Sequence, residues 1–498
     1  MCGVLGIISP MGQKPSRKNK ALDVYRGLLT LQHRGQDAAG ILSYDSLTRK
    51  FHGQKDLGLV SQVFNKENLT SLKGNMAIGH TRYATAGGDQ KEDLQPLVTG
   101  FPFGVGMVHN GNLVNYHSVS RNLKNTDKLQ LLTSNDLEIF LNLWCKYMTE
   151  ESKTKEFLFQ DAVRTCEKIF ENVEGGFALL GIQADEGLFG IRDPYGIRPL
   201  VLGKRNIEDG ENSFEYCLCS ETVTLNFLGF EYERDIEPGE LIFINNRGEV
   251  LSHIIESKEK KKPAPCMFEW VYFSGAESSI HNQSVYEARL NLGKLLANKA
   301  RKLIETGEIR SDVVCPVPDT SRTASISLAE NIGLPYREAL IKNRYSQRSF
   351  ILNTQEKRES AVELKLSPVI SEIKGKRILL VDDSIVRGTT SKKIIELLKK
   401  YGAKEITLAI TCPPLRYACY YGIDFPNPDE LIAKDKTLED IANWVGANKV
   451  IYLDEKDLNE AIGQENLCMA CVNNQYPTSL KDAEEFLEMR KINKEKNL

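Results

Sequence analysis

The chain has 498 residues, of which 41% are hydrophobic and 26% are charged, values typical of a globular enzyme with more than one domain. Its 64 basic and 67 acidic residues give a net charge of −3, which excludes the strongly basic surface that binding to nucleic acid or an anionic membrane requires. No apolar run reaches the roughly 18 residues of a membrane span, and the N-terminus lacks the basic start of a signal peptide. We therefore expect a cytoplasmic protein whose eleven cysteines are catalytic, metal-bound or buried thiols.

The first candidate for chemistry is Cys2. Removal of Met1, which precedes a small residue, would leave Cys2 at the N-terminus with a thiol and an α-amine on one residue. The reference pKa values are about 8.5 for the thiol and about 7.7–8.0 for the amine, so the amine can accept the thiol proton near neutral pH. The apolar segment 3–8 predicts a buried strand that starts at this nucleophile.

Four further segments of the first half place polar residues at the ends of predicted elements. They are Leu31–Gly40 between a helix at 21–32 and a strand at 40–44, Ile78–Gly87, Val108–Leu113, and Thr133–Asp136 ahead of a helix at 136–147. A glutamine hydrolase needs a cation for the substrate carboxylate, a carboxylate for its ammonium group and donors for the oxyanion. Arg82, Asp136 and the Asn110-Gly111 pair supply these types, although a surface ion pair, a helix cap and a hairpin turn would explain them separately.

Together these motifs resemble the glutaminase domain of class II (N-terminal nucleophile) amidotransferases over most of residues 2–200. The resemblance implies a four-layer αββα Ntn-hydrolase domain at residues 2–257. The roles it implies are nucleophile for Cys2, oxyanion hole for Asn110 and Gly111, and glutamine binding for Arg34, Arg82, Gly111 and Asp136.

Two later features of this half are expected to be structural. Asp193 and Arg198 lie in the segment Ile191–Leu200, and a place at the contact between domains is the alternative for them. Cys217 and Cys219 fit the alternation of a strand better than metal binding.

A change of pattern follows the charged, proline-ended linker candidate Glu256–Pro265. From there strands and helices alternate, which favours a parallel α/β sheet. The expected elements are a helix at 284–306, a strand at 312–317, a helix at 322–333, a strand at 377–381 and a strand at 405–411.

The most informative stretch of this half is Arg377–Thr390, an apolar strand that ends in Asp382-Asp383 and leads into the N-terminus of a helix. A helix N-terminus offers free N–H groups to an anion, and two carboxylates can hold a ribose diol and a hydrated divalent cation. The stretch resembles the phosphoribosyl pyrophosphate (PRPP) loop of type I phosphoribosyltransferases. That resemblance implies PRPP binding by Asp382, Asp383, Ser384, Ile385, Val386, Arg387, Gly388, Thr389 and Thr390.

Two other segments are expected to complete the PRPP site. The turn Pro318–Arg322 predicts Thr320 and Ser321, beside Asp382 and Asp383, as contacts of Mg²⁺. The basic segment Leu340–Ile351 predicts a lid that covers pyrophosphate with Lys342, Arg344 and Tyr345, and an exposed loop is the alternative.

The order glutaminase, then phosphoribosyltransferase, resembles the amidophosphoribosyltransferase family up to about residue 478. The resemblance implies a phosphoribosyltransferase domain at 266–478, a helical tail at 479–498, and transfer of ammonia from glutamine through an internal channel to PRPP in purine synthesis. It also implies inhibition by purine nucleotides and a homodimer or homotetramer. Two alternatives share one half only: another class II amidotransferase, such as a hexosamine-phosphate synthase, and a non-enzymatic PRPP-sensing regulator.

Four cysteines match a cofactor site of that family. Cys468-x-x-Cys471 alone is ambiguous between zinc, redox chemistry and no role. Many family members hold a [4Fe–4S] cluster in settings that Cys266, Cys419, Cys468 and Cys471 match. We expect a cluster with a structural role, and four ordinary buried thiols are the alternative.

Overall fold

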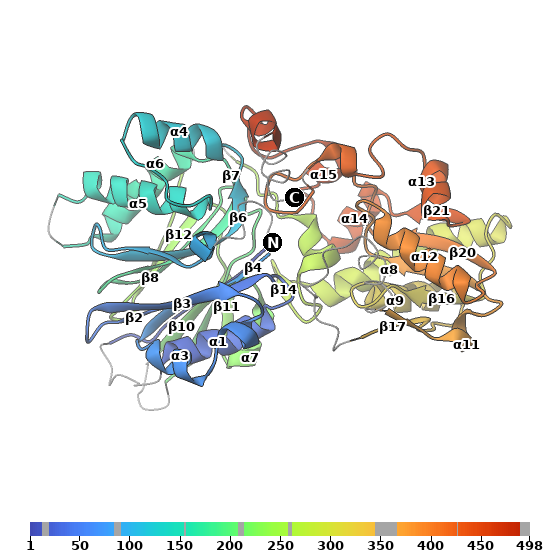
Figure 1. Cartoon of the computed structure of the whole chain (residues 1–498), viewed down its shortest axis with the longest axis horizontal. Coiled ribbons are helices and arrows are strands. Elements are labelled where there is room, and N and C mark those ends of the chain that lie inside the picture. Colours follow the sequence, from blue (N-terminus) through green and yellow to red (C-terminus); the bar gives the residue numbers. More distant parts are fainter. Residues whose placement is uncertain are drawn as a thin grey trace.

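The computed structural model describes residues 1–11, 19–83, 91–153, 156–207, 214–256, 261–343, 366–425 and 427–488. Two halves lie side by side, the first built on antiparallel sheets and the second on a parallel sheet (Figure 1). The N-terminus lies at the junction of the halves (Figure 1). The nucleophile candidate therefore begins beside the second half of the protein.

In the described residues, the first half contains a seven-stranded and a six-stranded antiparallel sheet. The first sheet runs β11 (Glu231–Asp235), β9 (Val201–Asn206), β10 (Phe214–Cys219), β1 (Gly3–Ile8), β4 (Met76–Arg82), β2 (Ala38–Asp45) and β3 (Lys50–Leu57). The second runs β13 (Val250–Ile254), β12 (Glu240–Asn245), β8 (Gly187–Arg192), β7 (Gly175–Gln183), β6 (Val105–Leu113) and β5 (Leu97–Thr99). β1, the strand after Cys2, is thus central in its sheet.

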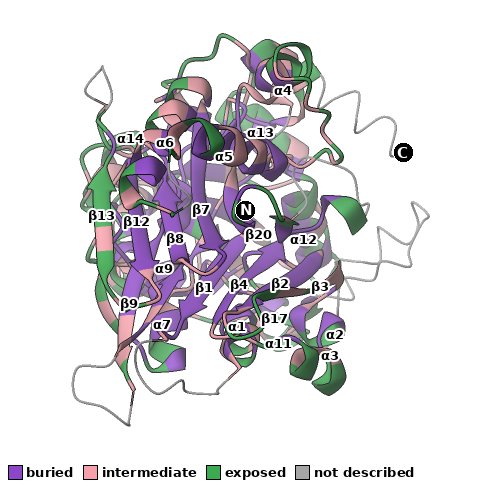
Figure 2. Ribbon diagram, turned by 90° about the vertical axis from the view of Figure 1, so that its left-hand side faces the viewer, coloured by how far each residue is buried: buried purple, intermediate pink, exposed green. Residues whose placement is uncertain are grey.

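The two sheets stack because successive side chains of a strand point to opposite faces. In β1, Val4 and Ile8 pack between the sheets, whereas Leu5 and Ile7 pack under the outer helices. The helices of this half are α1 (Lys20–Thr30), α2 (Val60–Val63), α3 (Lys66–Ser71), η1 (Lys91–Asp93), α4 (Tyr116–Asn125), α5 (Leu137–Glu151), α6 (Phe159–Asn172) and α7 (Thr222–Leu228). The strands are mostly buried and the outer helices carry exposed residues (Figure 2). The predicted αββα layering is confirmed.

The second half is built on a parallel sheet that runs β16 (Val313–Pro316), β19 (Arg377–Asp382), β20 (Glu405–Ile410) and β21 (Lys449–Tyr452) in the described residues. The longer helices are α8 (Val285–Glu305), α9 (Arg322–Ile332), α12 (Thr389–Lys400), α13 (Leu438–Val445) and α14 (Glu455–Ile462). Shorter elements are η2 (Glu269–Phe273), β14 (Ser279–Ile280), β15 (Gln283–Ser284), β17 (Leu340–Lys342), β18 (Leu366–Pro368), α11 (Ile370–Ile373), η3 (Pro428–Glu430) and α15 (Ala470–Asn473). Parallel strands bring their carboxyl ends to one edge, where such sheets bind ligands.

The predicted helices and strands exist, with ends that differ by at most four residues, but Asn110-Gly111, expected at a turn, lies within β6 and pairs with β7. The helix expected at 136–147 spans Leu137–Glu151, and the strand expected at 40–44 spans Ala38–Asp45. The start of the expected tail packs on the first half, since Ser118 of α4 donates to Asp482 at 2.9 Å and Arg121 pairs with Glu485. No helix in the described part of the chain is long and apolar enough to cross a membrane.

The crossing of α8 and α9 yields a test of the packing. A Cβ added at Gly293 of α8 would lie 2.1 Å from the carbonyl oxygen of Ala324 in α9. We expect Gly293→Ala to lower the free energy of unfolding by about 1–3 kcal/mol, because the helices must separate. Urea and thermal unfolding midpoints measure this effect. Gly100→Ala, with open space around the added carbon, is the control, and equal midpoints for both variants would contradict the packing argument.

Candidate active sites

Cys2 is held by both sheets of the first half. Its backbone nitrogen donates to Asn110 Oδ1 at 3.0 Å, and its carbonyl oxygen accepts from Arg34 Nε at 3.0 Å. Its Sγ lies 4.0 Å from the carbonyl oxygen of Tyr83. Burial lowers the pKa of the Met1 amine to about 6, so the surroundings favour an uncharged amine at the start of the chain. Removal of Met1 would place the amine on the Cys2 nitrogen, which Asn110 already contacts.

Asn110 and Gly111 lie in β6, opposite Cys2. Because Asn110 Oδ1 accepts from Cys2, its Nδ2 is directed elsewhere, and this buried donor has no partner among the described residues. Gly111 has φ +145°, and an added Cβ would lie 2.1 Å from the Gly176 carbonyl oxygen. The position therefore needs glycine. These features leave an amide donor available beside the thiol.

The segment Thr133–Asp136 caps α5 as predicted, but through Asn135, so the alternative that Asp136 is only a helix cap does not hold. Asn135 Oδ1 accepts from the Leu137 nitrogen at 3.0 Å, whereas Asp136 makes no capping hydrogen bond. Asp136 Oδ2 instead accepts from the Leu113 nitrogen at the end of β6 at 3.1 Å. Its carboxylate is thus turned toward the strand that carries Asn110.

Arg34 is brought to Cys2 by a close approach of two backbones. A Cβ on Gly35 would lie 2.5 Å from the Arg82 carbonyl carbon, so only glycine lets this turn pack against the end of β4. Arg82 itself is buried at that strand end. This packing brings Arg34, which donates to the Cys2 carbonyl, beside the end of β4 that carries Arg82.

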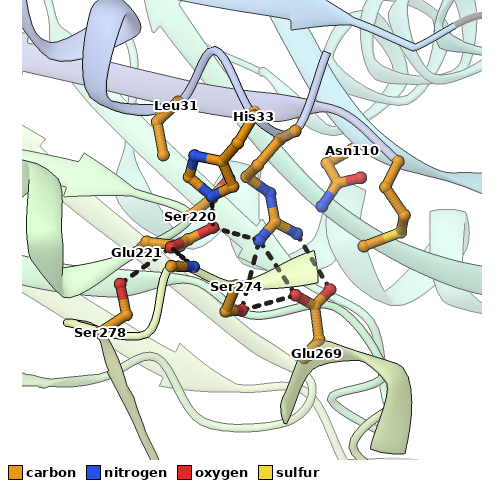
Figure 3. Close-up of polar contacts among 12 residues, drawn as sticks. Leu31, His33, Asn110, Ser220, Glu221, Glu269, Ser274 and Ser278 are labelled. Atoms are coloured by element: carbon orange, nitrogen blue, oxygen red, sulfur yellow. Dashed lines mark hydrogen bonds and ion pairs between the residues drawn. The ribbon is translucent and has the colours of Figure 1, made fainter. Parts of the chain in front are cut away.

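Arg34 is also the centre of a fully buried ion network (Figure 3). It donates to Glu221 Oε1 at 2.5 Å and to both oxygens of Glu269 at 3.0 Å. Burial opposes ionisation of Arg34, but Glu269 and Glu221 raise its pKa above the usual value. Since Glu269 belongs to η2, this network joins the nucleophile to the second half.

A second candidate site lies at the carboxyl edge of the parallel sheet. A cavity of about 430 Å³ is lined by the predicted PRPP loop, Asp382 to Thr390, together with Ser391, Thr320, Lys342, Asp319 and aromatic residues. Gly388 has φ +75°, and an added Cβ would lie 2.7 Å from Ile432 and Trp444. Glycine therefore allows the loop to enter α12 with Thr389 at its N-terminus, as predicted.

The acid pair of this cavity is buried, with Asp382 9% and Asp383 8% exposed. Burial and the Asp383 charge raise the pKa of Asp382 well above its usual value. Burial raises the pKa of Asp383 to about 6, although the hydroxyl of Ser384, which donates to it at 2.6 Å, and Arg289 lower it. Two buried acids facing one cavity are suited to hydroxyls or a cation rather than to another anion.

Of the other predicted contacts, Lys342 and Arg387 line the cavity as expected, whereas Ser321 does not. The Ser321 hydroxyl bonds the Val317 carbonyl beneath α9. Lys342 lines the cavity and donates to Asp319 at 2.8 Å. Arg387 pairs with Glu430. Arg344 and Tyr345 of the predicted lid lie outside the described residues.

Residues that the motif analysis missed connect the two sites. Tyr83, whose carbonyl approaches the Cys2 thiol, also lines the second cavity. Phe268, Tyr272 and Phe273 line that cavity around η2, whose Glu269 binds Arg34. Glu269 is an acid within the aromatic run Phe268–Phe273, a sequence signal that could have marked it.

A third connection is the segment Tyr420–Phe425. The Tyr420 carbonyl accepts from Asn112 Nδ2 at 3.1 Å. Gly422, with φ +97°, lies against Gly111, since an added Cβ would be 3.2 Å from the Gly111 carbonyl group. Ile423 and Phe425 line the second cavity. One short segment thus contacts β6 of the first half and the PRPP-loop cavity.

The four cysteines with cluster spacing are all buried in one region of the second half. The backbones of Cys266 and Cys468 pair in an isolated parallel β-bridge, and both thiols are free. The Cys468 nitrogen donates to the Pro265 carbonyl at 2.8 Å. Burial raises the pKa of Cys266 to about 11. In the described residues, no group of three or more His, Cys, Asp or Glu could hold a single metal ion. In a [4Fe–4S] cluster each thiolate binds a different iron, so its ligands need not converge on one point.

Comparisons with known proteins cover both halves. The glutamine amidotransferase domain model matches residues 80–214, and the phosphoribosyl transferase domain model matches residues 282–454. The chain is 40% identical to the amidophosphoribosyltransferase of Methanocaldococcus jannaschii over 494 residues, 96% of this chain and 98% of that protein. It is 41% identical to that of Haemophilus influenzae over 466 residues, 94% of this chain and 90% of that protein.

Two solved structures are similar over nearly the whole chain. One, described as the allosteric regulatory enzyme of purine biosynthesis, has a TM-score of 0.84 at 35% identity, covering 98% of this chain and 99% of that one. The other, a glutamine PRPP amidotransferase from B. subtilis complexed with ADP and GMP, has a TM-score of 0.82 at 36% identity, covering 96% and 98%. Full-length matches exclude the two alternatives that share one half only. With its paired sites and this identity over both halves, the chain belongs to the amidophosphoribosyltransferase family.

Proposed function

We propose that the protein hydrolyses glutamine at Cys2 and passes the ammonia to PRPP in the second cavity, forming phosphoribosylamine, glutamate and pyrophosphate in the first step of purine synthesis. The observation that carries this proposal is that Tyr83 both approaches the thiol and lines the PRPP-loop cavity. The site that releases ammonia and the cavity that receives it are therefore both bordered by Tyr83.

In the glutamine site, the Cys2 amine takes the thiol proton and the thiolate attacks the side-chain amide carbon. The unpartnered Nδ2 of Asn110 and the Gly111 nitrogen donate to the oxyanion. Arg82 binds the glutamine carboxylate and Asp136 its ammonium group. Arg34 positions Cys2 through the carbonyl it contacts. Ammonia leaves, and water then hydrolyses the thioester.

In the second site, the N-terminus of α12 and the hydroxyls from Ser384 to Thr390 bind the 5′-phosphate. Asp382 and Asp383 hold the ribose hydroxyls. Asp382, Asp383 and Thr320 have the oxygen ligands that Mg²⁺ prefers, and Mg²⁺ there would neutralise the pyrophosphate as it leaves. Lys342, with Arg344 and Tyr345, covers the pyrophosphate, and ammonia attacks C1 without needing a base.

Ammonia must be kept from water, where it would be protonated. The aromatic wall of Tyr83, Phe268, Tyr272 and Phe273 supplies apolar surface between the two sites. We infer that PRPP binding completes this path and activates glutamine hydrolysis.

The same proposal extends to the domain limits, the location, the assembly and the regulation of the enzyme. The glutaminase domain spans 2–257, the phosphoribosyltransferase domain spans 266–478, and the tail is 479–498, of which the described start contacts α4. The enzyme acts in the cytoplasm as a homodimer or homotetramer, and purine nucleotides inhibit it.

Cys266, Cys419, Cys468 and Cys471 fit a [4Fe–4S] cluster, because four buried thiols share one region and a buried arginine from the other half faces them. When bound, the cluster would tie together the segments of the second half that carry these cysteines and take no part in the chemistry.

The division of labour between the sites is tested at the nucleophile. We expect Cys2→Ala to reduce glutamine-dependent synthesis about a thousandfold or more, because no other group attacks the amide. Synthesis from ammonium salts should persist, since the second site is intact. The rate of phosphoribosylamine formation, assayed once with glutamine and once with an ammonium salt, measures the two activities. Cys145→Ala, at the other partly exposed thiol, is the control. Equal loss with both nitrogen sources would contradict two separate sites.

The PRPP site is tested at Asp382. We expect Asp382→Asn to raise the KM for PRPP about 10- to 100-fold, because one hydrogen bond to a charged group is lost. Basal glutamine hydrolysis without PRPP should not change. Asp312→Asn, which breaks a surface ion pair with Arg377 before β19, is the control. A large loss of basal hydrolysis in Asp382→Asn would argue against this assignment.

The contact between Gly422 and Gly111 is tested by adding one carbon. We expect Gly422→Ala to lower kcat for glutamine hydrolysis about tenfold, because the new Cβ presses on the oxyanion strand. Ammonia-dependent synthesis should stay within about twofold of the parent. Gly446→Ala has similar backbone strain, with φ +83°, but no neighbour nearer than 3.7 Å. If the two variants hydrolyse glutamine equally, the contact has no role in catalysis.

A further inference from the structure

Arg198 is a fully buried arginine that the proposed chemistry does not use. It lies between β8 and β9 of the first half, yet its neighbourhood is the cysteine region of the second. The carbonyl of Ile197, the preceding residue, accepts from the Cys266 nitrogen at 3.2 Å. The backbone therefore places Arg198 next to a proposed cluster ligand.

The hydrogen bonds of Arg198 are incomplete. Its Nη1 donates to Glu269 Oε1 at 3.3 Å and contacts Met1 Sδ, whereas Nε and Nη2 have no partner in the described part of the chain. Buried donors are normally paired, and an unpaired one costs about 1–3 kcal/mol. Arg192 shows the normal case, since its Nε, Nη1 and Nη2 all donate to backbone carbonyls. Arg198 thus lacks an acceptor on one side.

The charge of Arg198 is also incompletely balanced. Glu269, its one carboxylate contact, already binds Arg34 through both oxygens. Burial opposes ionisation of Arg198, but Cys266, Glu269, Cys419 and Cys468 raise the pKa of the guanidinium above its usual value. Thiolates of these cysteines would therefore be the nearest further negative charges. A buried cation with two unpartnered donors near three of the four cysteines is suited to an anionic acceptor.

We propose that Arg198 donates from Nε and Nη2 to the sulfurs of the iron–sulfur cluster that Cys266, Cys419, Cys468 and Cys471 hold, and so fastens the first half to that cluster. This inference rests on the cluster assigned under the proposed function. Arg198 is a positioning residue, since it touches neither glutamine nor PRPP. Through Glu269 and Arg34 its contacts continue to the Cys2 carbonyl.

The test uses the full chain purified without oxygen, as the parent protein and as Arg198→Met and Arg198→Lys. Arg192→Lys is the matched control, because Arg192 is equally buried nearby but its donors reach backbone carbonyls and His281 rather than cysteines. Iron and sulfide per chain, the rate of bleaching of the visible absorbance in air, and the midpoint potential of the cluster are measured.

We expect Arg198→Met to bleach at least about fivefold faster than the parent, because the cluster sulfurs lose donors and the halves lose a link. Its midpoint potential should be more negative, since the reduced cluster loses a nearby positive charge. Arg198→Lys keeps the charge but loses the planar donors, so its rate of bleaching and its midpoint potential should lie between those of the parent and of Arg198→Met. Arg192→Lys should match the parent in both the rate of bleaching and the midpoint potential.

Equal bleaching and potential in the parent and Arg198→Met would overturn the inference, as would equal effects of Arg192→Lys and Arg198→Lys. Parent protein without iron and sulfide would also overturn it. That outcome would leave the proposed reaction standing, because PRPP-dependent release of glutamate is assayed separately.

Discussion

The structure depends on one buried ion pair, Arg34 with Glu269, across the junction of the halves. Neither charge reaches water, so each is tolerable only because the other is present. Removing one partner of such a pair costs about 3–5 kcal/mol, since the remaining charge stays buried. Glu221 adds a second carboxylate to Arg34 and accepts from the Gly275 nitrogen and the Ser278 hydroxyl at 2.8 Å (Figure 3). The nucleophile is therefore held by groups from both halves.

This arrangement explains why the two sites are linked by backbone as well as by charge. η2 carries Glu269 toward Arg34 and its aromatic neighbours toward the PRPP cavity. Arg289 of α8 donates to the carbonyls of Trp270 and Ser274 at 2.9 and 2.8 Å, which fixes both ends of η2. The same arginine lowers the pKa of Asp383. A change of charge at Asp382 and Asp383 therefore acts electrostatically on Arg289, the residue that holds η2 in place.

The sequence predicted the local elements of this structure better than the contacts between elements that are far apart in the chain. The strand, acid pair, Gly388 and helix of the PRPP loop are consecutive, so their order alone determined the site. Cys2, Asn110 and Asp136 were recognisable as residue types, but only the structure shows that Asp136 does not cap α5 and turns its carboxylate toward β6. Tyr83 and Gly422 could not be predicted, since their roles depend on contacts between halves far apart in the chain. Arg344 and Tyr345, outside the described residues, remain predictions.

The acid pair also shows how a site for a polyanion can contain buried carboxyls. Asp382 and Asp383 begin where β19 ends, while the N–H groups of α12 and the hydroxyls of Thr389 and Thr390 begin a few residues later. The loop between them separates a negative end from a positive end within one cavity. A ligand with hydroxyls in the middle and phosphates at its ends satisfies both, whereas a simple phosphate would meet repulsion at the acids. Burial of the acids therefore selects for the sugar, and the helix N-terminus selects for its phosphate.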